Sequence, residues 1–261
     1  MVFALGPAAE RHGYRLISFD SSGSTVAEAL ERGRGGGAGR VWLVPARQTA
    51  GRGRRSRTWV SPPGNLAATV LEAMPIQSAA AATLGFAAGL SLHRALDDLG
   101  IAAQLKWPND VLLDGAKLSG IGLEAEAVGE GRLAVAVGIG VNVVSHPEGV
   151  PYAATSLAAT GHEVTAEALF AALSERWAEY RAIWDLGRGM DKLRQAWLSR
   201  AAGIGGPVSV VLNGRTVAGT FETIDNEGHL IVLTADGRRV PIASGDVFFG
   251  DAASSRPAGA A

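Results

Sequence analysis

The sequence predicts an α+β protein that ends, from Gly206 onward, in a small β-barrel of about 45 residues. Two segments, 165–185 and 190–201, have the pattern of amphipathic helices, and the alanine-rich segment 78–99 predicts a third, longer helix. After Gly206 the pattern changes to short β segments separated by glycine turns. We therefore expect two domains, at 1–204 and 205–250, followed by a disordered tail at 251–261.

The elements before the barrel follow from local patterns. Strands are expected at 14–20, 41–44, 65–72 and 132–143, and a helix at about 26–32 with Ser24 or Thr25 as its N-cap. The glycine-rich segment 31–40 follows that helix and is expected to be a loop. Thr165 is a plausible N-cap for the helix at 165–185, whose expected core residues are Leu169, Leu173, Trp177 and Ile183.

The composition is ordinary for a globular protein, with 47% hydrophobic and 19% charged residues. The net charge is −1, and without four clustered arginines only 20 basic residues stand against 25 acidic ones, so the basicity is local. A protein held on nucleic acid by phosphate contacts is more often basic over a whole face. The absence of cysteine excludes disulfides and thiolate chemistry. We find no signal peptide and no apolar run long enough to span a membrane, and expect a cytoplasmic protein.

The most informative stretch is 48–59, which reads Gln-Thr-Ala-Gly-Arg-Gly-Arg-Arg-Ser-Arg-Thr-Trp. Guanidinium groups bind carboxylate and phosphate oxygens as planar forks, and glycines let the backbone approach a ligand. The stretch therefore predicts an anion-binding loop, with a solvated basic loop as the alternative. Because ordering a loop costs about 1–2 kcal/mol per residue, we expect it to be mobile without ligand and to close over an anion. The four arginines are Arg52, Arg54, Arg55 and Arg57.

A second informative stretch is a predicted hairpin around Asp114-Gly115, which stands between two apolar runs. A two-residue turn would set Leu112 opposite Lys117 and Asp110 opposite Ser119, with all four side chains on one face. Lys117 would then lie diagonal to Asp110 at about 7–8 Å, too far for a contact ion pair but suited to flanking one ligand. The alternative is a surface hairpin with scattered charges.

Residues around the hairpin extend the candidate site. Lys106 and Lys117 are two of only three lysines among 24 basic residues, which suggests places where a compact ammonium is needed. Pro108 sets a bend between Lys106 and Asn109. In the expected strand at 132–143, Gly138 and Gly140 would let a flat group lie against the backbone, with Asn142 as a polar partner, unless they mark a bulge in a core strand.

Several familiar sites are missing. The sequence has no P-loop, no Gly-x-Ser-x-Gly elbow and no His-Glu-x-x-His motif, and its five histidines show no metal-ligand spacing. Covalent hydrolase chemistry and zinc chemistry therefore have little support.

Four blocks in order carry a family resemblance. The blocks are Gln48 to Trp59, Lys106-Trp-Pro-Asn-Asp110, Lys117-Leu-Ser-Gly120 and Gly138-Ile-Gly-Val-Asn142, and together they resemble biotin protein ligases, the biotin–acetyl-CoA-carboxylase ligases. The resemblance covers nearly the whole chain. It implies a mixed-sheet catalytic domain followed by an SH3-like barrel. It also implies that biotin is adenylated with MgATP and then transferred to one lysine of a biotin carboxyl carrier domain.

The resemblance also implies roles for single residues. Lys117, Arg52 and Asp110 would be catalytic, with Lys117 at the biotin carboxylate and α-phosphate. Asn109 and Asp110 would serve Mg²⁺, ATP or the incoming lysine. The residues implied in binding biotin or ATP are Ser24, Thr25, Gln48, Gly51, Arg52, Arg54, Arg55, Trp59, Lys106, Asn109, Lys117, Gly120, Gly138, Gly140 and Asn142.

Two residues depart from the family pattern. Val26 stands where asparagine is usual, which puts a local hydrogen bond in doubt, and Ser56 stands where glycine is usual, which restricts one loop torsion. Some members also carry an N-terminal helix-turn-helix. Only 13 residues precede the first expected strand here, so we expect no specific DNA binding. No membrane partner is expected, and a monomer and a homodimer both remain open.

Two other functions are possible. A lipoate ligase or octanoyl transferase would share the fold class, but the arginine block together with Lys106-Trp-Pro-Asn-Asp110 favours biotin. A nucleic-acid-binding module could use the arginines beside a small barrel. Against it stand the acidic balance of the rest of the chain and the lack of aromatic residues interleaved with the basic ones.

Overall fold

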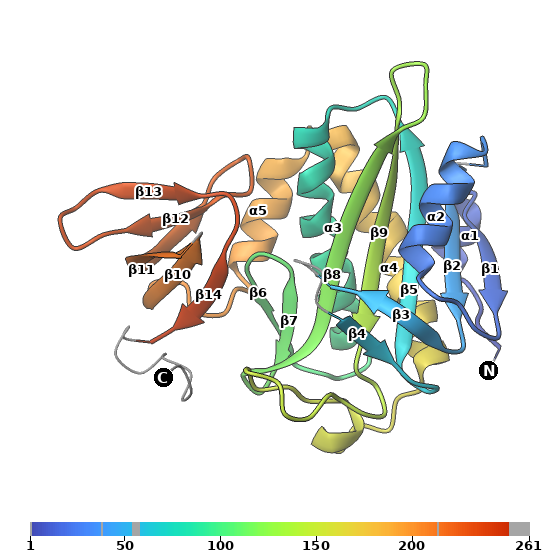
Figure 1. The fold of residues 1–261 in the computed structure, drawn as a ribbon, viewed down its shortest axis with the longest axis horizontal. Helices are drawn as coiled ribbons and strands as arrows, with labels where there is room; N and C mark the ends of the chain where they lie inside the picture. Colours follow the sequence, from blue (N-terminus) through green and yellow to red (C-terminus); the bar gives the residue numbers. More distant parts are fainter. Residues whose placement is uncertain (1, 38, 54–57, 213, 251–261) are drawn as a thin grey trace.

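The computed structural model describes residues 2–37, 39–53, 58–212 and 214–250. These residues form a seven-stranded sheet with helices on both faces, a five-stranded antiparallel sheet at the C-terminal end, and a separate two-stranded ribbon (Figure 1). The predicted α+β class with a mixed sheet and a small C-terminal β unit is therefore confirmed. No helix in the described ranges is long and apolar enough to cross a membrane.

The large sheet has the strand order β1-β2-β5-β9-β8-β7-β6. Only β1 and β2 run parallel, and every other neighbouring pair is antiparallel. The strands are β1 (Arg15–Phe19), β2 (Val41–Pro45), β5 (Leu66–Met74), β6 (Gln104–Lys106), β7 (Asp110–Leu113), β8 (Ala116–Ala127) and β9 (Leu133–Val141).

Both faces of this sheet are buried, which explains the continuous apolar runs in its central strands. Helix α2 (Thr25–Arg34) covers one face and packs Ala29 against Leu43 of β2. Helices α3 (Ser78–Asp98) and α4 (Ala166–Trp184) cover the other face, where Trp42 of β2 belongs to the main core (Figure 1). Successive residues of one strand thus point to opposite layers.

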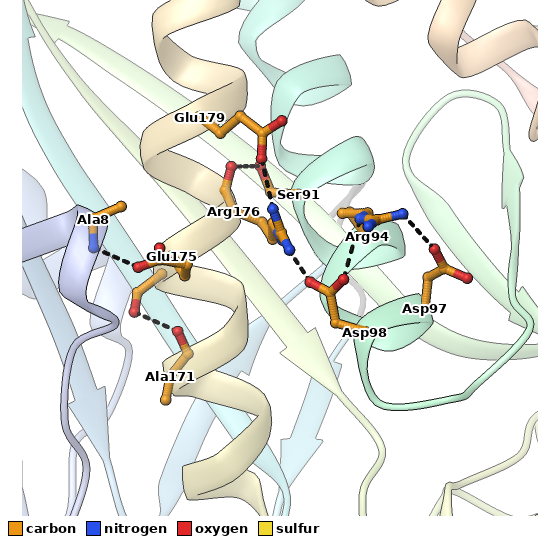
Figure 2. A network of polar contacts seen from close by, with 10 residues as sticks. Ala8, Ser91, Arg94, Asp97, Asp98, Ala171, Glu175, Arg176 and Glu179 are labelled. Atoms are coloured by element: carbon orange, nitrogen blue, oxygen red, sulfur yellow. Dashed lines mark hydrogen bonds and ion pairs between the residues drawn. The ribbon is translucent and has the colours of Figure 1, made fainter.

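Polar contacts join the C-terminal end of α3 to the middle of α4 (Figure 2). Arg176 of α4 donates to Asp98 of α3 at 2.5 Å and to Glu179 at 3.0 Å, and Arg94 bridges Asp97 and Asp98. Half-exposed ion pairs of this kind contribute about 0–1 kcal/mol each. The buried apolar contacts between the two helices therefore provide most of their stability.

Helix boundaries differ from expectation at two places. Helix α1 (Pro7–Arg11) was not predicted, because five residues are too short to show a helical period. Helix α2 continues to Arg34 through a segment expected to be a loop. Its Gly33 is buried, and a Cβ there would come within 2.8 Å of Ala134, so this glycine permits close packing on the sheet rather than a turn.

The helix caps and core residues agree with expectation more closely. Ser24 is the N-cap of α2 and Thr165 that of α4, each side chain accepting a backbone N–H three residues on. Leu169, Leu173 and Trp177 are fully buried. Ile183 is only partly buried and packs against the core. One 3₁₀ turn, Ala158–Thr160, precedes α4, and another, Asp185–Gly187, follows it. The short helix α5 (Met190–Leu198) comes next.

The C-terminal sheet has the order β13-β12-β11-β10-β14 and is antiparallel throughout. Its predicted turns contain Gly214, Gly228 and Gly237, all with positive φ. Trp107 of the large-sheet part donates its indole N–H to the carbonyl of Gly228 at 2.9 Å, which links the two sheets. The strands are β10 (Pro207–Leu212), β11 (Arg215–Ile224), β12 (Leu230–Leu233), β13 (Arg239–Ile242) and β14 (Asp246–Phe249). The predicted disordered tail at 251–261 lies outside the described residues.

Candidate functional site

The arginine-rich stretch begins and ends in strands rather than forming one long loop. Strand β3 (Gln48–Arg52) pairs antiparallel with β4 (Thr58–Ser61), so the arms of the expected loop are a ribbon that crosses the large sheet (Figure 1). Polar residues such as Gln48 and Thr49 do not show a strand period, which is why the ribbon was not predicted. The predicted residues Arg54, Arg55, Ser56 and Arg57 lie between these strands, outside the described residues.

A cavity lies between this ribbon, the large sheet and strand β14. It brings together residues from all four sequence blocks. The predicted site residues that line it are Ser24, Thr25, Gln48, Arg52, Trp59, Lys106, Asn109, Asp110, Lys117, Gly120, Gly138 and Gly140.

The hairpin of β7 and β8 has the predicted turn but not the predicted register. Asp114 and Gly115 both have positive φ, as a type I′ turn requires, and Leu112 faces Lys117 as expected. One residue farther on, a bulge in β8 shifts the pairing, so that Asp110 faces Gly120 instead of Ser119. Ser119 consequently points away from Lys117, is fully buried, and donates to the carbonyl of Gly140.

The expected separation of Lys117 and Asp110 was wrong. The Lys117 Nζ and Asp110 Oδ1 atoms lie 2.7 Å apart and form an ion pair, with 21% of each side chain exposed. The expected value of about 7–8 Å is the distance between diagonal residue positions on neighbouring strands. The side chain of Lys117 is four carbons long, so its ammonium reaches across this distance to Asp110. The bulge also moves Asp110 one position along β8.

Two aromatic rings flank the Lys117 ammonium. Its Nζ lies 5.8 Å from the ring centroid of Trp59 and 5.4 Å from that of Tyr152. Cation–π contacts of this length attract the ammonium to the faces of the two rings. Tyr152 was not among the predicted residues, since a lone tyrosine in a proline-containing loop gives no pattern from which to place it.

The glycines of β8 and β9 make room for Trp59. A Cβ at Gly140 would come within 2.3 Å of the indole nitrogen, and one at Gly120 within 3.2 Å of the ring. A flat group was expected against Gly138 and Gly140. At Gly140 this group is the indole of Trp59. At Gly138 a Cβ would instead meet the side chain of Val26 at 2.7 Å. Neither glycine has the positive φ of a turn.

The end of the cavity beneath α2 is polar. Gln48 Oε1 accepts hydrogen bonds from both the backbone N–H and the hydroxyl of Thr25, each at 3.0 Å. The Thr25 hydroxyl in turn accepts from Thr69 at 2.7 Å. Gly51 does not line the cavity. A Cβ there would come within 2.3 Å of Gln48 Nε2, so Gly51 leaves the space in which this amide lies.

Strand β14 closes the cavity on the side of Lys106. Asp246, Val247 and Phe248 line the cavity, and Lys106 Nζ lies 5.3 Å from the ring of Phe249. Burial lowers the pKa of Lys106 and the charge of Lys117 lowers it further, although Asp110 and Asp246 oppose these effects. Residues of the C-terminal sheet were not predicted in the site.

Two asparagines predicted in the site have different positions. Asn109 lines the cavity and donates from Nδ2 to the carbonyl of Ile121 at 2.7 Å. Asn142 does not line it. This residue is buried and donates to the carbonyl of Thr155 at 3.0 Å, which holds the loop that carries Tyr152.

One group of possible metal ligands lies apart from the cavity lining. Asp225, Glu227 and His229, in the turn between β11 and β12, have ligand atoms within 4.8 Å of one another, the only such His, Cys, Asp and Glu group in the part of the chain that the structure describes. Its spacing within a turn differs from the metal motifs sought in the sequence. His229 Nδ1 lies 3.0 Å from Asp225 Oδ2, so the three residues already contact one another.

Family models match two parts of the chain. Residues 38–142 match the biotin/lipoate A/B protein ligase family, and residues 203–250 match the biotin protein ligase C-terminal domain. The first match spans the ribbon, the hairpin and the glycines of β9, and the second spans the five-stranded sheet.

Relatives and solved structures agree with these matches. The chain is 42% identical over 236 residues to the biotin–[acetyl-CoA-carboxylase] ligase of Paracoccus denitrificans, covering 87% of this chain and 97% of that protein. It is 31% identical to the bifunctional ligase/repressor BirA of Bacillus subtilis, covering 94% of this chain and 77% of that protein. A biotin protein ligase from Aquifex aeolicus, solved with biotin and ATP, superposes with a TM-score of 0.74 at 25% identity, covering 90% of this chain and 99% of that chain.

Proposed function

This chain belongs to the biotin protein ligase family, and we propose that it activates biotin with ATP and transfers it to a lysine of a biotin carboxyl carrier domain. In the first step a biotin carboxylate oxygen would attack the α-phosphorus of ATP. The bond to the β-phosphate would break, giving biotinyl-5′-AMP and pyrophosphate. In the second step the lysine amine would attack the activated carbonyl carbon, lose a proton and release AMP.

The observation that best supports this proposal is the position of Lys117 in the cavity. Negative charge builds on the α-phosphate during both steps, and a fixed ammonium stabilises it. Asp110 and the rings of Trp59 and Tyr152 hold the Lys117 ammonium in one place, so little reorganisation is needed when the charge develops. Arg52, which lines the same cavity, provides a second cation.

Mg²⁺ is a further part of the proposal. Mg²⁺ prefers oxygen ligands and is often held by one or two carboxylates together with substrate phosphates. The carboxylate of Asp110 and the amide of Asn109, which line the cavity, fit this preference and would hold the ion. When bound, the ion would neutralise phosphate charge.

The arginine-rich tip between β3 and β4 is proposed to close over the bound adenylate. Excluding water would protect the mixed anhydride from hydrolysis. Arg52 at the end of β3 is the described member of this proposed lid. Equal protease sensitivity at 51–58 with and without ligand would contradict the closure.

We also propose the domain division at 1–204 and 205–250, which the family match at 203–250 supports. The cytoplasmic location and the absence of specific DNA binding stay predictions.

The proposal is tested by measuring ATP-dependent pyrophosphate release with biotin, lipoate and octanoate in parallel. We expect release with biotin alone, followed by biotin transfer when an apo carrier domain is added. Larger release with lipoate or octanoate would make the chain an acyl ligase of the same fold, and no biotin-dependent release would refute the proposed activity.

A further inference from the structure

A buried hydroxyl beneath the polar end of the cavity has no place in the proposed chemistry. Thr69 lies on β5, opposite Gly138 of β9, and is fully buried. It does not line the cavity. Its Oγ1 donates to the Oγ1 of Thr25 at 2.7 Å. A buried threonine on a core strand therefore directs its one hydrogen toward a residue that does line the cavity.

This donation fixes the direction of the next hydrogen bond. Because the Thr25 hydroxyl accepts from Thr69, its own hydrogen is available for Gln48 Oε1, 3.0 Å away. The backbone N–H of Thr25 donates to the same oxygen at 3.0 Å. Two donors thus hold the Oε1 atom of the Gln48 amide, so the amide oxygen faces Thr25.

The other side of the amide is left for a ligand. Gln48 lines the cavity, and its Nε2 lies in the space that Gly51 leaves open. Within the described ranges, Nε2 donates no hydrogen bond to another residue. The amide can therefore offer a ligand N–H donors and no acceptor, because its oxygen is already used twice.

We infer that Thr69 is a positioning residue that fixes the Gln48 amide, so that this end of the cavity selects a ligand with an uncharged acceptor oxygen. The inference rests on the proposed function and adds its specificity. The cyclic urea of biotin has such an oxygen. Lipoate and octanoate have no oxygen apart from the carboxylate, which the proposed reaction requires at the α-phosphate. The hydrogen bonds from Thr69 through Thr25 to Gln48 would then contribute to selectivity for biotin over acyl substrates.

Thr69→Val tests this role, because valine has the same shape and lacks the hydroxyl. A lost hydrogen bond of this kind weakens binding roughly five- to tenfold. We expect the KM for biotin to rise by this factor, with kcat and the KM for ATP within about twofold of wild type. Selectivity for biotin over octanoate should fall by the same factor. Thr69→Ser keeps the hydroxyl and should restore the wild-type KM.

Biotin binding by calorimetry and thermal unfolding are measured on the same variants. An unchanged biotin KM in Thr69→Val would overturn the inference, as would equal impairment of the valine and serine variants. If the valine variant does not fold, Thr69→Ala is compared with Thr69→Ser by the same criteria. Failure of the proposed function is distinguishable, because wild-type protein would then show no biotin-dependent pyrophosphate release at all.

Discussion

Lys117 of β8 and Asp110 of β7 form an ion pair of 2.7 Å inside a cavity that also contains Arg52 and Lys106. The pair joins two of the sequence blocks at one point. Three cations, Arg52, Lys106 and Lys117, against two carboxylates, Asp110 and Asp246, leave net positive charge in the cavity lining, which favours a ligand rich in phosphate and carboxylate groups. The ion pair holds Lys117 in the position at which such a ligand would need it.

Removing the Lys117 ammonium should abolish most of the activation step. In Lys117→Ala we expect the rate of biotin-dependent pyrophosphate release to fall by roughly 10²- to 10³-fold, the usual effect of losing one preorganised charge-stabilising group. The far-ultraviolet circular dichroism spectrum should not change. Lys192→Ala is the matched control, since Lys192 is exposed on α5, away from the cavity. Wild-type release by Lys117→Ala would contradict the role given to this lysine.

Arg52→Ala should weaken the retention of the adenylate. A charge-assisted hydrogen bond contributes about 1.5–3 kcal/mol, so the lifetime of the bound intermediate should shorten by roughly ten- to a hundredfold. The measurement is the decay of enzyme-bound radiolabelled adenylate after rapid gel filtration. Arg47→Ala, also exposed but outside the cavity lining, should keep the wild-type lifetime. An unchanged lifetime in Arg52→Ala would exclude a clamp at this residue.

Gly140→Ala should displace the Trp59 indole. The added Cβ would come within 2.3 Å of the indole nitrogen, and overpacking of this kind costs about 1–3 kcal/mol. We expect biotin-dependent pyrophosphate release to fall at least about tenfold. Gly85→Ala, where a Cβ meets no atom within 4 Å, should leave release unchanged. Equal release by the two variants would show that the position of Trp59 does not matter.

Trp107→Phe should loosen the contact between the two sheets. The variant loses the hydrogen bond to Gly228 and leaves a buried carbonyl unpaired, at a cost of about 1–3 kcal/mol in the free energy of unfolding. Urea denaturation measures this loss. Trp42→Phe is the control for the smaller ring, because the buried indole N–H of Trp42 has no hydrogen-bond partner among the described residues. A cost for Trp107→Phe no larger than for Trp42→Phe would mean that the link contributes no stability.

His93 should make stability depend on pH. Burial, and next the charge of Arg200, lower the pKa of His93 below its ordinary value of 6.5, while Ala103 and Asp97 act in the opposite direction and Arg94 adds to the lowering. His93 therefore binds a proton more readily in the unfolded chain than in the folded protein. The free energy of unfolding should fall as pH drops through about 6.5 and level off below the folded-state pKa.

Urea denaturation of wild type and His93→Gln at pH 7.5 and pH 5.5 isolates this effect. Wild type should lose more stability than the variant between the two pH values, because the other titrating groups are common to both. An equal loss in the two proteins would exclude His93 as the cause.

The sequence predicted those parts of the site that depend on local pattern. Asp114-Gly115 predicts a turn because few residues tolerate two successive positive φ values, and the turn is present. The bulge at Leu118 was not predictable, because no glycine or turn residue marks it in the sequence and the Leu118 side chain is simply buried in the core. The ion pair between Lys117 and Asp110 was missed because the expected separation described strand positions, whereas the long lysine side chain spans that diagonal.

Other site residues were missed because they come from distant parts of the chain. Tyr152 and Asp246 reach the cavity only through the packing of a loop and of a second sheet, which no local spacing encodes. In the sequence, nothing distinguishes Thr69 from the other residues of the expected strand at 65–72. Its hydroxyl gains importance only from Thr25, 44 positions earlier in the chain.

Strand β14 is both a wall of the cavity and the outermost strand of its sheet. In the described part of the chain it pairs with β10 alone, over four residue pairs from Asp246 to Phe249. A mechanical load applied at Gly250, for example by a surface tether or a bulky fusion partner, would peel this short strand first. The cavity would then open before the seven-stranded sheet bore any tension, so attachment at the other end of the chain, marked N in Figure 1, is the better choice for immobilising an active protein.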